Sequence, residues 1–370
     1  MRLTKNQIIN IVVSFVLLAI CVGLLIYIDL DKKSYNYIIS IVEKSLIYAV
    51  VALSMNIVVG FTGLFSLGQA GFMAIGAYVT AIFTIPVADR ANVYYMNGIA
   101  DSIANVSLPI PVALILGGLV AAAFAALIGI PVLRLKSDYL AIATLGFAEI
   151  IRAVIASPMM DKITNGSYGL KNIPAFRGSI ECFICCAILI VIMILIINSS
   201  KGRDFKAIRE DEIAAESVGI DLFKTKELSF VISSFFTGMG GGLLAMFMRS
   251  IDSKTFSIVL TYDILLIVVL GGIGSITGSI AGSFLVTAGK ELLRFFDDPF
   301  YIGSFQVPLF RTGFRMVIFS ILLMVVVLFF RKGLLGGKEF VPSEIVYFIK
   351  HNIIDKIILF IKRKMKKGEK

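Results

Sequence analysis

The chain has 370 residues, of which 58% are hydrophobic and 16% charged, and its formal net charge is +10. A soluble domain carries about 25% charged residues, so this composition excludes an ordinary soluble globular protein. The charge does not indicate nucleic-acid binding either, because residues 331–370 alone hold 11 basic and 4 acidic residues. A basic tail that follows a membrane span is expected to meet anionic lipid headgroups.

Apolar blocks of membrane-span length follow one another along the chain and predict an all-α polytopic membrane protein. The first block is longer than a signal peptide and no small-residue cleavage site follows it, so we expect a retained helix. We predict about ten transmembrane segments, with eight to ten as the range, at Ile8–Ile28, Ser45–Val59, Gly71–Val87, Ile110–Pro131, Tyr139–Ala156, Ile180–Ile197, Leu228–Met248, Ser257–Leu270, Ile276–Ala288 and Phe314–Phe330.

Two predicted segments, Ser45–Val59 and Ile276–Ala288, are short for a bilayer that needs about 20 helical residues. Each adjoins a glycine-rich stretch, Gly60–Gly68 or Gly271–Gly278. Short, glycine-interrupted segments in matching halves are typical of transporters whose broken helices line the pathway. Close helix packing through small residues explains the same glycines equally well. The pathway-lining candidates are Gly63, Ser66, Gly68, Gln69, Gly271, Gly272 and Gly274.

Lysine and arginine set the expected orientation of the spans. With a cytoplasmic N-terminus, the inner stretches hold 21 basic residues and the longer outer loops hold 12. We therefore expect both termini and residues 198–227 on the cytoplasmic side. Five segments on each side of this charged loop would fit two inverted five-helix pseudo-repeats.

Eight of the twenty residues in Ala207–Lys226, AIREDEIAAESVGIDLFKTK, are charged. Asp204 is a suitable helix N-cap, and Gly219 suits the left-handed residue after a helix end, so we predict one helix of about 14 residues. Lys206–Glu210 and Arg209–Glu212 have the spacing of ion pairs on its wet side. Phe205, Ile208, Ala215 and Val218 fall roughly along one stripe of that helix. The residues alone leave open whether this helix is a connector between spans or a docking element for a cytoplasmic partner.

Other motifs are weaker. Glu149 and Arg152 can form an ion pair on one helical face, either at a polar cavity or subunit interface or near the outer membrane surface. The four cysteines lie in apolar blocks without a metal-ligand pattern and are expected to be small apolar filler. Gly272–Gly278 never reaches the Gly-Lys-Ser/Thr of a P-loop, so no route to ATP hydrolysis is predicted within this chain.

The last 33 residues, 338–370, form a separate basic tail after a transmembrane region that we place at 1–337. Within the tail, apolar residues of Glu344–Lys364 recur every three or four positions, with lysines between them. This spacing predicts an amphipathic helix on the inner leaflet, with a disordered basic tail as the alternative.

Six ordered blocks resemble the permease subunits of bacterial branched-chain amino acid ABC importers. Residues 202–233, which hold Glu212-Ile-Ala214-Ala215-Glu216 and Gly219, look like their coupling segment, the EAA loop. Residues 133–155 resemble the M-type subunit. The other similar blocks are 60–78, 165–174, 264–282 and 328–336. Gln69 and Phe65 depart from the family's frequent His and Gln, which puts fine substrate preference in doubt.

This resemblance implies an ABC importer permease fold in a bacterial cytoplasmic membrane. Its implied partners are an H-type permease, two ABC ATPase subunits and an extracytoplasmic binding protein that delivers leucine, isoleucine or valine. This chain would bind no cofactor, since ATP and Mg²⁺ would sit on the ATPases. The implied ATPase contacts are Arg209, Glu210, Asp211, Glu212, Ala214, Ala215, Glu216 and Gly219.

Three alternatives remain. A permease of the same superfamily could import urea, an amide or a sugar, and a binding protein of the amino acid kind would argue against it. An ion-coupled transporter would work without any ATPase partner. An integral-membrane enzyme would need a polar catalytic cluster, whereas the single histidine lies in the tail.

Overall fold

The computed structural model describes residues 32–294 except 97 and 136, and a few positions outside that range: 22–23, 25–26, 29, 301–302, 305–306, 314, 317–321, 324, 333 and 339. The chain divides into two compact units, Asn36–Gly337 and a second formed by Met1–Tyr35 with Lys338–Lys370. The predicted spans Ile8–Ile28 and Phe314–Phe330 lie largely outside the described residues, and the predicted tail helix lies wholly outside them.

Helices make up most of the first unit. The long ones are α2 (Lys32–Asn56), α3 (Gln69–Thr84), α6 (Ile110–Val132), α7 (Ser137–Ile155), α9 (Ser179–Ile197), α10 (Ser200–Glu210), α12 (Leu222–Met248), α13 (Ile258–Gly271) and α14 (Ile276–Leu292). The short elements are the π-helical turn η1 (Ile57–Phe61), α4 (Val87–Val93), α5 (Asp101–Ala104), η2 (Pro158–Met160), α8 (Asp161–Thr164), η3 (Gly166–Tyr168), α11 (Glu212–Ser217), η4 (Ser253–Phe256), and the antiparallel pair β1 (Tyr301–Ile302) and β2 (Phe305–Gln306).

Four helical stretches in the described part are long and apolar enough to cross a bilayer: Tyr35–Phe61, Ile110–Val132, Ser179–Ile197 and Leu222–Met248. Tyr139–Ile155 and Pro158–Thr164 meet at 58° and form either a fifth, broken span or a re-entrant loop. Gln69–Thr84 and Ile258–Gly271 are shorter apolar helices. The prediction of an all-α polytopic membrane protein is confirmed, while the count of ten segments stays a prediction.

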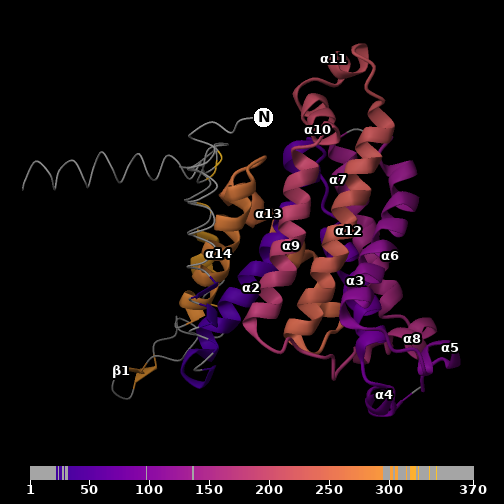
Figure 1. The fold of residues 1–370 in the computed structure, drawn as a ribbon, viewed down its shortest axis with the longest axis vertical. Coiled ribbons are helices and arrows are strands. Elements are labelled where there is room, and N and C mark those ends of the chain that lie inside the picture. The colour runs from indigo at the N-terminus through magenta and orange to yellow at the C-terminus, as the bar shows by residue number, and fades with distance from the viewer. Residues whose placement is uncertain are drawn as a thin grey trace, which may run out of the picture. The chain divides into compact units, whose positions relative to one another are not determined.

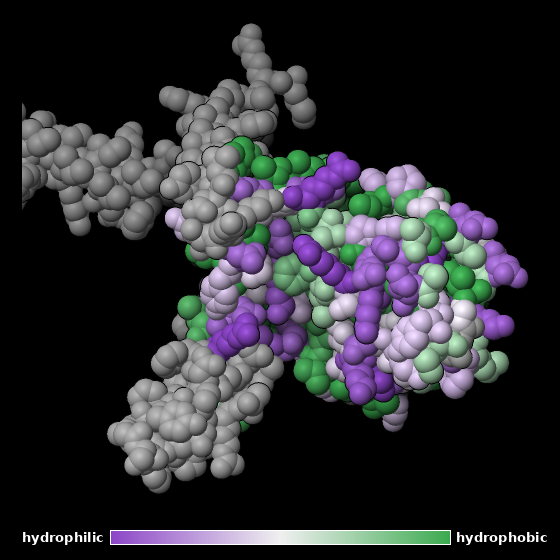
Figure 2. All heavy atoms as spheres, turned by 90° about the horizontal axis from the view of Figure 1, so that it is seen from below, coloured by the Kyte–Doolittle hydropathy of each residue, from purple (hydrophilic) through white to green (hydrophobic). Residues whose placement is uncertain are grey.

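Exposed hydrophobic side chains lie where a bilayer would cover them. On α6, Leu119 is 54% exposed and Leu127 69%, and on α9 Ile188 is 54% exposed and Leu195 65%. Each pair is about two helical turns apart and so lies on one face of its helix. Seen from the end that holds α4, α5 and α8, hydrophilic residues occupy much of the face, while hydrophobic residues show at its edges (Figure 2). Apolar sides between polar ends are what a bilayer requires.

Helices α3, α6 and α12 form the centre of the unit, and they approach closely because their contact positions lack side chains. A Cβ on Gly76 of α3 would lie 2.0 Å from the carbonyl oxygen of Gly238 on α12. A Cβ on Gly241 would lie 2.1 Å from the carbonyl oxygen of Met73. Such backbone contact is a common way for membrane helices to associate in the absence of a hydrophobic driving force between them.

The expectation of a short segment at Ser45–Val59 is wrong. α2 begins at Lys32 and passes into η1, so the span runs without a break through Lys44. The sequence suggested a membrane boundary there because Lys44 is charged, but its ammonium nitrogen lies 3.7 Å from a carboxylate oxygen of Glu291. α14 likewise runs to Leu292, four residues beyond the predicted end. Ion pairing between helices therefore allows charged residues to continue a span.

Candidate functional site

The charged segment between α9 and α12 folds at one end of the long helices, while α4, α5 and α8 lie at the other end (Figure 1). α10 starts at Ser200 because the Ser199 hydroxyl accepts a hydrogen bond from the Gly202 backbone N–H at 3.3 Å. Phe205 and Ile208 are buried and fix α10 to the membrane helices. The first part of the segment is therefore an anchored helix.

The helix ends at Glu210, and a second helix follows at once. The Asp211 carboxylate accepts hydrogen bonds from the backbone N–H groups of Ile213 at 2.8 Å and Ala214 at 3.0 Å, which caps α11. Gly219 has φ +91°, a conformation that favours glycine. Its backbone N–H donates to the Glu216 carbonyl at 2.9 Å. The prediction of a positive-φ glycine after the helix is confirmed.

The prediction of one helix capped by Asp204 is wrong. Asp204 lies inside α10, with a carboxylate oxygen 3.3 Å from the Lys201 ammonium nitrogen. Serine and aspartate are both good caps, and the sequence offered both Ser199 and Asp211. The backbone at Asp211 is extended, with φ −159° and ψ 114°, so the chain turns between the two helices.

The predicted ion pairs also change because of this turn. Arg209 pairs with the adjacent Glu210, in place of the predicted pair with Glu212. Glu212 instead lies 2.6 Å from the ammonium nitrogen of Lys226 on α12. Lys206 lies with its ammonium nitrogen 5.4 Å from the ring centroid of Phe61. Charged groups therefore join α11 to α12 and α10 to η1, and the predicted pair between Arg209 and Glu212 does not form.

α11 presents an apolar surface that the rest of the described chain does not cover. Ala215 is buried, as the predicted stripe requires, but Val218 is 77% exposed, so its place in that stripe is wrong. Ile213 is 81% exposed. Glu212, Ala214 and Glu216 are exposed beside them. An exposed pair of aliphatic side chains bordered by carboxylates has the character of a docking surface.

Arg209 joins α10 to both glycine-rich breaks. Its guanidinium Nη1 donates a hydrogen bond to the carbonyl oxygen of Gly60 in η1 at 2.9 Å. A Cβ on Gly274, in the break between α13 and α14, would lie 2.7 Å from the same nitrogen. Gly63 lies against the aliphatic part of Arg209, because a Cβ there would be 3.1 Å from its Cγ. One side chain of the charged segment therefore touches both breaks.

The two breaks also bind each other through a buried asparagine. Asn56, at the end of α2, accepts a hydrogen bond from the Gly274 backbone N–H at 2.8 Å. Its amide nitrogen donates to the Ser275 carbonyl at 2.9 Å and lies 2.8 Å from the Ser279 hydroxyl. Gly272 and Gly274 have φ +121° and +81°, and Gly271 ends α13. The predicted helix interruptions are confirmed, and they meet although more than two hundred residues separate them.

The pathway candidates of the first break are mostly buried. Gln69 is 2% exposed, and its carbonyl oxygen accepts from the Thr237 hydroxyl at 2.5 Å while its amide nitrogen donates to the Ser233 hydroxyl at 3.2 Å. Thr237 also lies 2.8 Å from the Ser54 hydroxyl. Ser66 and Gly68 are buried as well, whereas Gly63 is exposed. Gln69 thus joins α2, α3 and α12 through a satisfied polar network.

The structure brings Glu149 and Arg152 together on α7, with a carboxylate oxygen 2.6 Å from a guanidinium nitrogen. Both side chains are about one third exposed. Within the described residues, no three histidine, cysteine, aspartate or glutamate side chains gather in a way that could hold a metal ion.

Sequence reasoning missed Asn56, Ser233 and Thr237. Asn56 carried a signal, because it is a strong hydrogen-bonding residue in an apolar run four positions before Gly60. A buried amide in a bilayer needs partners, so such a residue marks a contact with another polar stretch. Ser233 and Thr237 are spaced by one helical turn on α12, but small hydroxyl residues are common in membrane helices and carry little signal alone.

Comparison with known proteins shows the family of the chain. A family model described as the branched-chain amino acid transport system / permease component matches residues 37–328. The chain is 34% identical over 294 residues to the high-affinity branched-chain amino acid transport system permease protein LivM of Escherichia coli (strain K12). That match covers 70% of this chain and 64% of the relative, so the chain spans less than two thirds of that relative's length.

Two archaeal relatives extend the comparison. The chain is 25% identical over 326 residues to the probable branched-chain amino acid transport permease protein LivM of Methanocaldococcus jannaschii, covering 80% of this chain and 92% of the relative. It is 26% identical over 204 residues to the probable LivH permease protein of the same organism, covering 52% and 61%. No solved structure matches the chain.

Proposed function

The chain belongs to the branched-chain amino acid transport permease family, and on that premise we propose that it is the membrane subunit of an ATP-driven importer of leucine, isoleucine and valine. It is a transporter subunit rather than an enzyme. Separate ATPase subunits hold ATP and Mg²⁺, a second permease of the H type completes the pathway, and an extracytoplasmic binding protein delivers the solute. The LivM and LivH relatives, both named as permease proteins of branched-chain amino acid transport, support the pairing of two permeases.

The observation that carries the coupling role is that α10 is packed against the membrane helices whereas α11 exposes apolar side chains. α10 is anchored, since Phe205 is fully buried and Arg209 bonds to Gly60. α11 is presented, since Ile213 and Val218 are exposed at the end of the long helices. A connector between spans does not require an exposed aliphatic pair on a capped helix. A helix that docks into an ATPase does, because apolar anchors bordered by charges supply affinity and register.

The mechanism follows from these contacts. ATP binding brings the two ATPases together and moves α11, and α10 follows because Asp211 joins the two helices directly. Arg209 passes that displacement to η1 and to the α13–α14 break, where the pathway is proposed to lie. Such a shift requires the ATPases to contact α11 differently in their two states. In this proposal residues 198–227 and both termini face the cytoplasm.

The assignment of Gly63, Ser66, Gly68, Gln69, Gly271, Gly272 and Gly274 to the pathway remains part of the proposal. What supports it is that both breaks are real interruptions of helices and touch at Asn56 and Gly274. Irregular backbone at membrane depth is tolerated where protein or a water-filled cavity surrounds it. The burial of Gln69 indicates that its role would be to position α12 against α3.

Affinity purification of the tagged chain from its native membrane tests the assembly, with the attached subunits identified by mass spectrometry. Two ATPases and a second permease are expected, and absence of both ATPases would refute the proposal. Ile213→Ser should weaken ATPase recovery at least fivefold. Met159→Ser is the matched control, because Met159 is an equally exposed aliphatic residue, in η2, away from α11.

A functional arm uses proteoliposomes that contain the purified assembly and the binding protein. Gly219→Pro removes the hydrogen bond to Glu216 and cannot adopt φ +91°, so it should abolish ATP-driven uptake while the protein remains inserted. Ala215→Glu should also reduce uptake, since Ala215 lies on the buried side of α11 and a glutamate does not fit there. Normal uptake in both variants would show that α11 is not the coupling element.

A further inference from the structure

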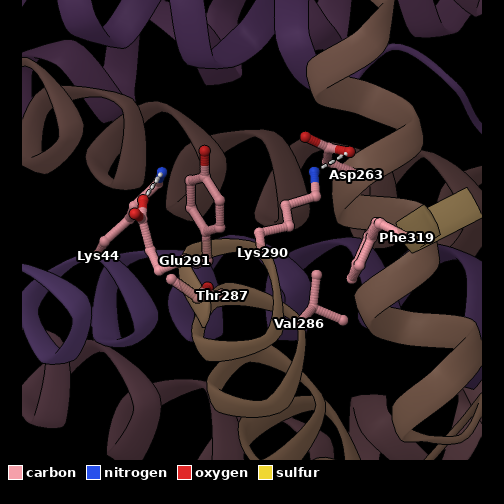
Figure 3. Close-up of a pocket in the computed structure, with 8 residues that line it drawn as sticks. Lys44, Asp263, Val286, Thr287, Lys290, Glu291 and Phe319 are labelled. Carbon is pink, nitrogen blue, oxygen red and sulfur yellow. Dashed lines mark ion pairs between the residues drawn. The ribbon is translucent and has the colours of Figure 1, made fainter. Parts of the chain in front are cut away.

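A cavity of about 120 Å³ is lined by residues of α2, α13 and α14 and by Phe319 (Figure 3). Lys44 comes from α2, Asp263 from α13, and Lys290 and Glu291 from α14. The cavity is of the same order as an engineered protein cavity of about 150 Å³ that admits benzene, so a small solute fits its scale.

The charged groups on the cavity wall balance each other. Lys290 and Asp263 form a tight pair, with an ammonium nitrogen to carboxylate oxygen distance of 2.5 Å. Lys44 and Glu291 form a looser pair at 3.7 Å, which is longer than a hydrogen bond. Glu291 also lies 4.0 Å from a guanidinium nitrogen of Arg294, and the Lys44 ammonium lies 5.8 Å from the Tyr48 ring centroid. The four side chains are between 17% and 31% exposed, so a solute can reach them. The cavity therefore offers two cations and two anions at no net charge.

The remaining wall is mostly apolar, apart from the hydroxyl groups of Tyr48 and Thr287. Val286 and Phe319 are buried, and Phe319 also lies under the Lys290 ammonium, 5.2 Å from ring centroid to nitrogen. Thr287 is 2% exposed, and its hydroxyl has no hydrogen-bond partner among the described residues. A buried hydroxyl without a partner is destabilising, and a polar ligand group in the cavity would satisfy it.

We propose that this cavity binds a zwitterionic α-amino acid with a small aliphatic side chain. The ligand carboxylate lies at Lys44, the ligand ammonium at Glu291, and the aliphatic side chain against Val286 and Phe319. A lone anion or cation is disfavoured, because it satisfies one member of the loose pair and repels the other. The zwitterion satisfies both at once.

The position of the cavity along α14 fits a solute that has not yet crossed the membrane. Lys290 lies 14 residues along α14 from Ile276, which is about 21 Å at 1.5 Å per residue. The break between α13 and α14, which Arg209 touches at Gly274, is therefore at the other end of α14. If the proposed function holds, on which this placement rests, the cavity belongs to the outer half of the membrane and receives the amino acid before the breaks do.

The chain contains no tryptophan, so a single introduced tryptophan reports on one place. Phe319→Trp in the full chain, reconstituted in lipid nanodiscs, should change its emission on addition of leucine with a saturable curve. Leucinol, which lacks the carboxylate, and 4-methylpentanoate, which lacks the ammonium, should require at least tenfold higher concentrations. Ile213→Trp is the control reporter on α11 and should not respond. Equal responses to all three compounds, or none to leucine, would overturn the proposal.

Charge variants separate a binding role from a structural one. Lys44→Met combined with Glu291→Met removes the loose pair without leaving a lone charge, and should weaken the leucine response at least tenfold. Lys224→Met is the matched control, because Lys224 pairs with Asp221 at 3.0 Å on the cytoplasmic-end segment. Saturation-transfer NMR of leucine with the chain that keeps Phe319 gives the same comparison without the reporter. Unchanged leucine binding in the double variant would assign the pair to packing alone.

Different results would refute the cavity proposal and the proposed import function. If the purified assembly imports leucine while the tryptophan reporter and the NMR signal stay silent, the cavity proposal is overturned and the import function stands. If leucine binds at the cavity but the chain recovers no ATPase from its membrane, the import function fails and the site stands.

Discussion

The guanidinium of Arg209 donates a hydrogen bond to the carbonyl oxygen of Gly60 at 2.9 Å, across 149 positions of sequence. Arg209 belongs to a polar surface helix and Gly60 to the end of a membrane span. The same guanidinium lies against Gly274, which Asn56 in turn holds by a hydrogen bond to its backbone N–H. A displacement of α10 therefore acts on two spans through one side chain.

Arg209→Gln should uncouple transport while leaving the fold intact. The shorter amide cannot reach Gly60 from α10, and Arg209 is 36% exposed, so the loss of stability should be about 1 kcal/mol. ATP-driven leucine uptake in proteoliposomes should fall at least tenfold, with little change in ATP hydrolysis. Arg203→Gln is the control, because Arg203 is exposed on the same helix. Uptake that falls equally in both variants would point to surface charge instead of this bond.

Gly60→Ala should be strongly destabilising. An added Cβ would lie 1.7 Å from Asn56 Oδ1 and 2.4 Å from the Gly274 backbone nitrogen, so the two breaks would have to separate. The expected cost is about 2–4 kcal/mol, measured as a lower melting temperature in detergent. Gly146→Ala on α7 is the matched control, because nothing lies within 4 Å of its added Cβ. That variant should be neutral or more stable by up to about 1 kcal/mol, since alanine favours helix.

Arg90 should be essential for the loops at the end opposite α11. It is 2% exposed, and its guanidinium donates to the backbone carbonyls of Ile85, Ala104 and Val106 at 3.1, 2.9 and 2.7 Å. Arg90→Met leaves these carbonyls without that donor and should cost about 3–5 kcal/mol. Arg90→Lys should recover only part, because one ammonium cannot span the same set. Limited proteolysis of residues 85–108 gives the readout, and wild-type resistance in Arg90→Met would contradict this role.

Stability of that end should fall at alkaline pH. Burial raises the pKa of Tyr94 to about 12, and its hydroxyl donates to the Ile163 carbonyl at 2.7 Å. Because this pKa is above that of an unfolded tyrosine, about 10, the stabilisation is present below pH 10 and is lost as pH rises toward 12. Tyr94→Phe should lower stability at pH 8 but flatten its decline between pH 9 and pH 11. Melting temperatures across that range test it, and parallel declines in the two proteins would refute the assignment.

The sequence predicted most helices because apolar blocks determine them, and α6, α9 and α13 begin and end within a few residues of the expected positions. It failed at Lys44 and Lys290, where pairing across helices lets a charged residue continue a span. It also failed at Asp204 and Asp211, because Ser199, Asp204 and Asp211 are all good caps and local spacing does not show which of them start helices. The contact of Asn56 with Gly274 was beyond single-sequence reasoning, since it depends on how distant spans are arranged.

The meeting of the two breaks constrains how the protein is made. During synthesis, the ribosome completes α2 more than two hundred residues before Gly274 and Ser279 exist. Until then the Asn56 amide lacks its final partners in a medium where an unsatisfied amide costs several kcal/mol. The nascent chain must therefore hold its first half in a provisional arrangement and complete it only when α14 inserts. A chain truncated before residue 274 would keep this amide unsatisfied, which is a feature that membrane quality control can recognise.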